Sequence, residues 1–403
     1  MNRRFSYSAK NVHDIQVDEL TVRLWSVDGP GNRRDIEKML RPLAKTGFVY
    51  PYMALMPDWH PGSEAAIVGS VIPTKAVLLP DMIGGDIGCG MTAVRLPLKI
   101  TELSGRLESI ARSLREMIPS GTAHNSVITD RVQSNHLWQR ELRAPVSNRT
   151  FRKLARQFAS LGGGNHFLEI QNDHEEHLWI MLHSGSRYLG IQVHDWYIEQ
   201  GAKESGIDTK VYSRIPYLHA ESEVALDYLS DMSAVQEFAR ESRKEMMVRA
   251  LEVMQKADST LDIQSIMTNG IEVGHNYVAI EEHFGEKLFI HRKGAISVPK
   301  GSVGIVPGSM GTFSYVVEGR GNGYAFDSCA HGGGRAMSRA AASRTISSKS
   351  FQESMKNVIY DSNESFIDEA PAAYKDIRAV MRGQKDLVKI LCELKPVISI
   401  KGH

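Results

Sequence analysis

Five glycine-rich stretches of this 403-residue sequence carry a histidine or a cysteine, and they are its clearest chemical signal. Three read Asp-Ile-Gly-Cys-Gly-Met at 86–91, Gly-Gly-Gly-Asn-His-Phe-Leu-Glu at 162–169 and His-Gly-Gly-Gly-Arg at 331–335. The other two read His-Ser-Gly-Ser-Arg at 183–187 and Gly-His-Asn-Tyr at 274–277. Because glycine has no side chain, such backbone approaches a ligand closely and adopts positive φ at little cost. Together the loops predict one site where metal ions, phosphate and backbone meet.

Metal binding is the first chemistry that these residue types suggest. Asp86 and Cys89 are three residues apart, which lets a carboxylate and a thiolate reach one metal ion or two adjacent ones. A thiolate can bridge two cations, and imidazoles can fill the remaining positions, for which the candidates are His166, His183 and His275. A mixed oxygen, nitrogen and sulfur set with open positions suits Mn²⁺, Zn²⁺ or Fe²⁺. A pair of such ions can clamp the attacking and leaving oxygens of phosphoryl chemistry.

The same residues also allow a plainer interpretation. A histidine beside glycine is common in turns and cores, and the sequence lacks the Cys-x-x-Cys and His-Glu-x-x-His patterns of local zinc sites. His-Gly-Gly-Gly also occurs in the oxyanion loop of lipases, but the sequence has no Gly-x-Ser-x-Gly nucleophile elbow. Residue types and spacing therefore favour a metal and phosphate site and leave structural turns open as the alternative.

Composition narrows the class of protein. Hydrophobic residues make up 42% of the chain and charged residues 24%, which predicts a globular protein with a sizeable core. The net charge of +1 argues against a strongly basic surface but is compatible with a local basic groove for nucleic acid. We expect neither a membrane helix nor a signal peptide, because the apolar runs are too short. Three cysteines are too few for a disulfide framework, so we expect a cytoplasmic protein.

The elements that must position these loops are strands and helices in alternation. Short apolar runs predict strands at 52–56, 65–72, 76–79, 178–182, 287–291, 295–298, 303–306 and 315–317. Apolar spacing near that of a helical turn predicts helices at 101–118, 151–160, 189–256, 335–344 and 375–394.

Between these elements, residues 119–150 are polar and weakly periodic and predict a long surface excursion whose arginines could reach RNA. Strands are predicted on both sides of the helical middle, and the candidate ligands span residues 86–331. A site assembled from segments so far apart requires them to fold together, so we expect one interwoven domain.

A longer series of motifs stands in the order found in a known protein family. The matching stretches include Met-Pro-Asp-Trp-His at 56–60 and continue at 69–75, 86–91, 164–170, 181–187, 275–278, 292–295, 307–311, 331–339, 373–377 and 401–402. Ordered motifs over roughly residues 45–402 are far more specific than any single glycine loop. By these motifs the sequence resembles the RtcB-type RNA ligases.

The resemblance implies an α+β fold over residues 1–403, a single RtcB-like domain with mixed β-sheets flanked by helices and the active site in a central cleft. It implies two Mn²⁺ ions held by Asp86, Cys89, His166, His183 and His275, with Cys89 as the bridge, and it makes His331 the histidine that GTP guanylylates. The implied GTP pocket consists of Asn165, Phe167, Glu169, Pro307, Gly308, Ser309, Met310, Ser314, Gly332, Gly333, Gly334, Tyr374 and Lys401. Arg187 and Arg339 are the implied contacts to RNA phosphates.

The implied reaction joins an RNA 3′-phosphate or 2′,3′-cyclic phosphate end to a 5′-hydroxyl end through an RNA-(3′)pp(5′)G intermediate, in RNA repair or tRNA splicing. An activating helper protein is a further partner that the resemblance allows. Two alternatives stay open: a dinuclear metal phosphoesterase, which would not need His331 or Lys401, and an RNA-end-binding protein with a closed structural metal shell. The sequence departs from the family pattern at 59–64, at Gly274 and at Gly333, and these departures leave every implied ligand in place.

Overall fold

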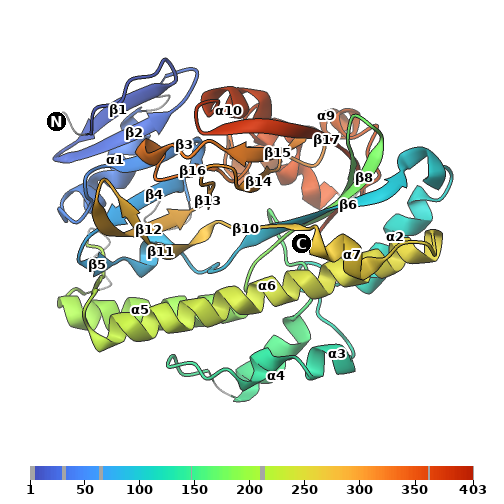
Figure 1. Cartoon of the computed structure of the whole chain (residues 1–403), viewed down its shortest axis with the longest axis horizontal. Helices are drawn as coiled ribbons and strands as arrows, with labels where there is room; N and C mark the ends of the chain where they lie inside the picture. Colours follow the sequence, from blue (N-terminus) through green and yellow to red (C-terminus); the bar gives the residue numbers. More distant parts are fainter. Residues whose placement is uncertain are drawn as a thin grey trace.

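The computed structural model describes residues 5–29, 33–62, 67–146, 148–208, 214–361 and 364–402. Two large β-sheets occupy the middle of the molecule and helices flank them, with the long helix α6 (Glu223–Ala257) running across one side (Figure 1). This arrangement confirms the predicted α+β class, in which one of the two large sheets is mixed and the other is antiparallel. Within the described residues, no helix combines the length and the apolar character needed to cross a membrane.

The first sheet has six strands and is mixed. In spatial order they are β1 (Val12–Val17), β2 (Leu20–Trp25), β3 (Met53–His60), β4 (Val68–Thr74), β12 (Glu286–Lys293) and β11 (Asn276–His283). β2 and β3 pair in parallel, because helix α1 (Arg33–Ala44) returns the chain to the same end of the sheet, as a parallel pair requires. Ile36, Leu40 and Leu43 bury the apolar face of this helix in a core beneath the sheet.

The second sheet has seven antiparallel strands and carries most of the glycine-rich loops at its strand ends. In spatial order they are β10 (Ile271–Gly274), β6 (Gly90–Lys99), β8 (His177–Ser184), β7 (Phe167–Asn172), β17 (Val388–Lys401), β15 (Ser314–Gly319) and β14 (Val303–Val306). Two small pairs complete the strands: β13 (Ala295–Ser297) with β16 (Ser328–Ala330), and β5 (Val77–Leu78) with β9 (Leu218–His219).

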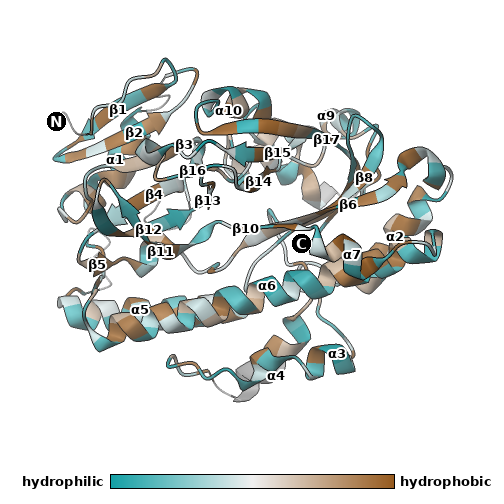
Figure 2. Cartoon of the chain, in the orientation of Figure 1, coloured by the Kyte–Doolittle hydropathy of each residue, from teal (hydrophilic) through white to brown (hydrophobic). Residues whose placement is uncertain are grey.

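Helices cover the sheets and connect their strands. The remaining ones are α2 (Leu107–Met117), α3 (Asp130–Gln133), α4 (Asn148–Gln157), α5 (Tyr188–Ser205), α7 (Ile263–Thr268), α8 (Arg339–Thr345), α9 (Ser348–Ser354) and α10 (Ile377–Gly383). The Ser222 hydroxyl accepts the backbone N–H of Ala225 and caps α6. Hydrophobic and hydrophilic residues mix around α6 (Figure 2), and its buried face packs on α2, α5, β6 and β8.

Most of the predicted elements are present. The strands predicted at 52–56, 76–79, 178–182, 287–291, 295–298, 303–306 and 315–317 correspond to β3, β5, β8, β12, β13, β14 and β15. The strand predicted at 65–72 is β4, which begins at Val68, while residues 65–66 lie outside the described residues. The helices predicted at 101–118 and 151–160 are α2 and α4, and the helical stretch 189–256 is divided into α5 and α6.

Two predicted helices are wrong in extent. The helix predicted at 375–394 ends at Gly383 as α10, and the chain then forms β17, which pairs with β15 on one side and β7 on the other. Pairing on both edges outweighs the helical spacing of this segment. The helix predicted at 335–344 begins only at Arg339, because Arg335 forms a bridge with Tyr374 and the Ser338 side chain caps α8.

The segment predicted as a surface excursion, 119–150, is held against α6 by ion pairs. Arg131 lies 2.6 Å from Glu245, Arg140 lies 3.4 Å from Glu237, and Arg143 lies 3.5 Å from Asp227. These arginines fasten the segment to α6, and about half or more of each side chain stays exposed, so RNA contact by this segment stays a prediction. Residue 147 lies outside the described residues.

Candidate active site

A cleft of about 1110 Å³ lies among the glycine-rich loops and is lined by residues of both large sheets. Its lining includes the predicted GTP-pocket residues Asn165, Phe167, Glu169, Pro307, Gly308, Ser309, Met310, Gly332, Gly333, Gly334, Tyr374 and Lys401. Asp86, Cys89, His183, His275, His331 and Arg339 also line it. The lining does not include His166, Ser314 or Arg187, although the Ser314 hydroxyl accepts the N–H of Gly308, which lines the cleft, at 3.4 Å.

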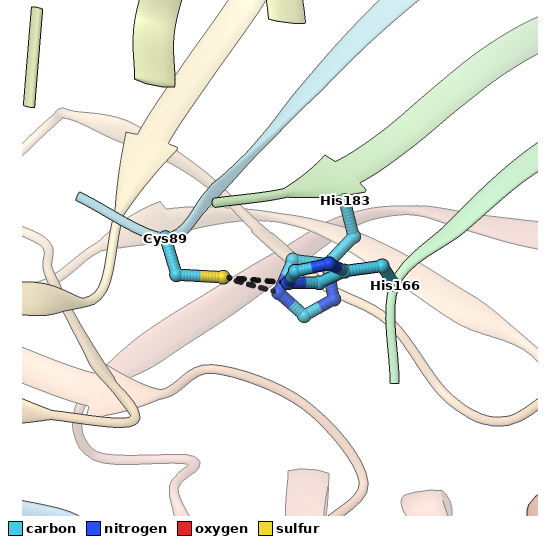
Figure 3. Close-up of side chains that lie close together, drawn as sticks. All are labelled: Cys89, His166 and His183. Carbon is cyan, nitrogen blue, oxygen red and sulfur yellow. Dashed lines mark hydrogen bonds between the residues drawn. The ribbon is translucent and has the colours of Figure 1, made fainter. Parts of the chain in front are cut away.

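The buried side chains of Cys89, His166 and His183 point toward one another (Figure 3). The Cys89 Sγ lies 3.4 Å from His166 Nε2 and 3.2 Å from His183 Nε2. Strand register brings them together, because Gly90 pairs with Ser184 and Phe167 pairs with His183 across β6, β8 and β7. Two imidazoles and one thiol at this separation form a ligand set that could hold a metal ion.

Asp86 and His275 extend this set on either side. His166 Nε2 lies 3.1 Å from Asp86 Oδ2, and His183 Nε2 lies 2.9 Å from His275 Nε2. The Asn276 side-chain oxygen lies 3.1 Å from His275 Nδ1, which orients the ring with its Nε2 toward His183. All five residues predicted as metal ligands thus form one connected cluster, and all but His166 open onto the cleft.

The surroundings of the cluster favour neutral imidazoles, an ionised Asp86 and a protonated Cys89 thiol. Burial and the neighbouring His275 hold the pKa of His183 well below its usual range, and burial lowers the pKa of His275 to about 3. Burial opposes ionisation of Asp86, but the hydrogen bond and charge of His166, together with Cys89 and His275, outweigh it and lower the pKa to about 2. Burial and Asp86 raise the pKa of the Cys89 thiol well above its usual value. A bound cation displaces that proton, since thiolates and neutral imidazoles are the forms that bind metals.

At two positions in these loops, neighbouring atoms lie so close to the backbone that only glycine fits. A Cβ atom on Gly185 would lie 1.9 Å from Asp86 Oδ1, so the carboxylate packs directly on this backbone. A Cβ atom on Gly334 would lie 1.9 Å from the carbonyl oxygen of Asp58, and Gly334 has φ +67°. Glycine at these positions lets the ligand loop and the His-Gly-Gly-Gly loop fit against their neighbours.

His331 is held beside the cluster by a buried carboxylate. Asp58 Oδ2 lies 2.7 Å from His331 Nδ1 and also accepts the backbone N–H groups of His331 and Gly332, at 3.1 and 3.2 Å. An imidazole that donates from Nδ1 keeps its Nε2 lone pair free. The rings of His331 and His275 lie 4.8 Å apart, so this nitrogen is next to the candidate metal centre.

Glu369 joins residues from both predicted binding sets. Its Oε2 accepts hydrogen bonds from Lys401 Nζ and the Tyr374 hydroxyl, each at 2.6 Å. Its Oε1 lies 2.6 Å from Arg339 Nη1 and 3.1 Å from Arg335 Nη1. The cluster thus contains three cationic side chains, those of Lys401, Arg335 and Arg339. It contains two carboxylates, Glu369 and Asp368, and Asp368 Oδ2 lies 2.6 Å from Arg339 Nη1. The cluster therefore carries more positive than negative charge at the edge of the cleft, which suits a phosphate ligand.

Glu169 is another buried carboxylate that lines the cleft. Glu169 accepts hydrogen bonds from Gln171 Nε2 at 2.6 Å and from the Ser399 hydroxyl at 2.9 Å. Burial raises the pKa of Glu169 to about 7. Gln171 also donates to the Ser314 hydroxyl at 3.0 Å, which connects two residues of the predicted GTP pocket.

The two predicted RNA-contacting arginines occupy different settings. Arg339 lines the cleft, and nearly half of its side chain is exposed. Arg187 does not line the cleft, donates to the carbonyl oxygen of Gly121 at 2.8 Å and has φ +57°. Burial lowers the pKa of Arg187, with Asp86 acting in the opposite direction.

Sequence reasoning missed three residues that the structure places in the site. Asp58 and Lys375 stand in the motifs at 56–60 and 373–377 but receive no role there. Lys375 Nζ donates to the carbonyl oxygens of Pro57 and Trp59, and burial lowers its pKa to about 8. Glu369 stands in no glycine-rich loop, and no local signal identifies it.

The fold and the site define an α+β protein with a candidate metal centre, a carboxylate-held histidine and a basic cluster in one cleft. A family model described as "tRNA-splicing ligase RtcB" matches residues 39–402. The chain is 34% identical over 412 residues to the RNA-splicing ligase RtcB of Escherichia coli K12, covering 97% of this chain and 100% of that relative. It is 29% identical over 433 residues to the tRNA-splicing ligase RtcB of Thermococcus kodakarensis, covering 88% of each. The chain belongs to the RtcB family of RNA ligases, which confirms the resemblance seen in its motifs.

Proposed function

We propose that the chain is a GTP- and Mn²⁺-dependent ligase that joins RNA 3′-phosphate or 2′,3′-cyclic phosphate ends to 5′-hydroxyl ends. The carrying observation is the contact of 2.7 Å between Asp58 Oδ2 and His331 Nδ1, beside the connected Cys, His and Asp cluster. An Nδ1 that donates to Asp58 leaves the Nε2 lone pair of His331 available as a nucleophile in the same cleft as the candidate metal ligands.

Each residue set has a role in this proposal. Asp86, Cys89, His166, His183 and His275 would hold two Mn²⁺ ions, and the ions would supply charge neutralisation of the triphosphate. His331 Nε2 attacks the α-phosphorus of GTP, forming a P–N bond as the bond to the pyrophosphate oxygen breaks. Lys401, Tyr374 and the backbone of Gly332–Gly334 hold the nucleotide. Arg339 and Arg187 bind RNA phosphates through paired guanidinium hydrogen bonds.

Two further transfers complete the reaction. An oxygen of the RNA 3′-phosphate attacks the GMP phosphorus, the P–N bond breaks, and His331 is free again. The 5′-hydroxyl then attacks the RNA phosphorus, loses its proton, and displaces GMP to form the phosphodiester bond. A 2′,3′-cyclic phosphate end must first be hydrolysed to the 3′-phosphate. Because the participating residues run from Asp58 to Lys401, the proposal also treats the chain as one RtcB-like domain.

Two observations favour ligation over the alternatives. Cys89, His183 and His275 line the cleft, so a metal bound there would keep open positions, whereas an end-binding protein with a structural metal needs a closed shell. The Glu369 cluster places Lys401, Tyr374 and two arginines around the cleft, and a phosphoesterase has no use for a nucleotide pocket of this kind. RNA repair and tRNA splicing both supply the required ends.

The test is covalent labelling. The protein is incubated with GTP labelled at the α-phosphate and with Mn²⁺, then denatured and separated by electrophoresis. We expect label on the wild-type chain and none on His331→Ala. Absence of label on the wild type with every divalent metal tried would refute the ligase mechanism, and label retained by His331→Ala would refute the assignment of the nucleophile.

A further inference from the structure

Helix α6 forms the floor beneath the candidate metal centre. Gln236, Ala239 and Arg243 recur along one face of the helix, which packs against the turn that carries Asp86 and Cys89. A Cβ atom on Gly88 would lie 2.8 Å from Gln236 Cα and 3.3 Å from Ala239 Cβ, so the turn rests directly on the helix. Gly88 has φ +73°, a conformation that glycine adopts without strain.

Arg243 is the charged residue of this face, and it is 2% exposed. Its Nη1 donates to the carbonyl oxygens of Gly88 at 2.9 Å and Ser184 at 2.8 Å. Its Nε donates to Glu272 Oε1 at 3.0 Å, and its Nη2 contacts the same carboxylate. The Thr92 hydroxyl of β6 donates to the other oxygen of Glu272, so the carboxylate is bound by one helix and one strand.

These three acceptors belong to three different ligand-bearing segments. Gly88 precedes Cys89, Ser184 follows His183, and Glu272 stands on β10 three residues before His275. One planar guanidinium therefore fixes the relative positions of segments that are far apart in the sequence. Glu272 balances its charge, and its hydrogen bonds set the geometry of the segments around the centre.

We infer that Arg243 is a positioning residue for the metal centre, holding the Cys89, His183 and His275 segments in register from beneath. The inference rests on the metal centre proposed above. Ligand distances in such a centre must be kept within a few tenths of an ångström. Residues that orient metal ligands typically change metal affinity by about 10–100-fold when substituted, and we expect a loss of that size for Arg243→Met.

The same helix offers a matched control. Arg249 is 5% exposed and pairs with Glu245 at 3.0 Å and with Asn125 Oδ1 at 2.7 Å. It is a buried, hydrogen-bonded arginine of α6 whose partners bear none of the proposed ligands. A purely structural role for Arg243 predicts that the two arginines behave alike, whereas a positioning role predicts that they differ in metal binding.

The experiment titrates Co²⁺ into the purified full-length chain and follows the thiolate-to-cobalt absorption band, with Mn²⁺ as competitor. Thermal unfolding followed by circular dichroism gives the stability of each variant. We expect Arg243→Met to weaken Co²⁺ binding by about 10–100-fold and to alter the band, with partial rescue in Arg243→Lys. Arg249→Met should lower the unfolding temperature but keep the wild-type band and affinity.

The outcomes distinguish a failure of this inference from a failure of the proposed metal centre on which it rests. A wild-type chain without a cobalt–thiolate band would overturn the metal centre itself. A wild-type band that Arg243→Met reproduces at the same affinity would overturn only the role of Arg243, as would an equal loss in Arg249→Met. If Arg243→Met does not fold, Arg243→Lys and Glu272→Gln carry the test, and wild-type cobalt binding by both would overturn the inference.

Discussion

Replacing Asp58 by asparagine changes one acceptor atom beside the proposed nucleophile. In the wild type, Asp58 Oδ2 accepts the Nδ1 hydrogen of His331 and two backbone N–H groups, whereas Oδ1 is buried without a hydrogen-bond partner in the described structure. An asparagine oxygen is therefore drawn to the Oδ2 position, where three donors converge, and the NH₂ group takes the Oδ1 position. The tautomer of His331 is preserved and the negative charge is lost.

The magnitude follows from the change in hydrogen-bond type. Bonds to a charged group contribute about 1.5–3 kcal/mol and neutral bonds about 0.5–1.5 kcal/mol, a difference of about 1–2 kcal/mol. At about 1.4 kcal/mol per factor of ten, guanylylation of His331 should slow about 5–30-fold. An NH₂ group facing Nδ1 would instead impose the wrong tautomer, for which losses of about 10⁴-fold are known in serine proteases.

The assay is single-turnover labelling of the chain with α-labelled GTP, with GTP affinity measured separately. Asp262→Asn is the matched control, because Asp262 caps α7 by accepting the N–H groups of Gln264 and Ser265, and asparagine caps equally well. Labelling of Asp58→Asn at the wild-type rate would show that Asp58 does not act on His331. A loss near 10⁴-fold would show that the amide is oriented opposite to the three-donor argument.

Three further predictions concern the nucleotide pocket, the metal centre and pH. Lys401→Met removes the ammonium 2.6 Å from Glu369 and should weaken GTP binding about tenfold or more by calorimetry, whereas exposed Lys389→Met on the same strand should not. Cys89→Ser should lose bound metal by elemental analysis, with Cys392→Ser as the unaffected control; equal metal content would contradict the bridging role. Burial raises the pKa of Glu169 from 4.5 to about 7, so its contribution to stability is present below about pH 4.5 and lost as pH rises through 7. In urea unfolding, the free energy of unfolding of Glu169→Gln should rise relative to that of the wild type by up to about 3 kcal/mol between pH 5 and 8. Parallel pH profiles of the two proteins would contradict this.

Local sequence was sufficient for the parts of the site that stand at strand ends. The apolar run at 178–182 predicts a strand that delivers His183, and β8 does so. The glycines around Cys89 and His331 correctly indicate close backbone approach, since Gly88 rests on α6 and Gly334 rests on Asp58. These features depend on residues within a few positions of one another, and motif order was enough to identify the family.

Tertiary structure alone decided which distant side chains meet. Asp58 contacts His331 across 273 positions, and Glu369 gathers Lys401, Tyr374 and Arg339 without any local pattern around it. The end of the chain has helical spacing in part, yet it forms β17 because β7 and β15 provide hydrogen-bonding edges on both sides. Sequence periodicity and propensity depend only on residues close together in the chain. These contacts instead form because buried carboxylates and strand edges need hydrogen-bond partners, and that burial exists only once the sheets have assembled.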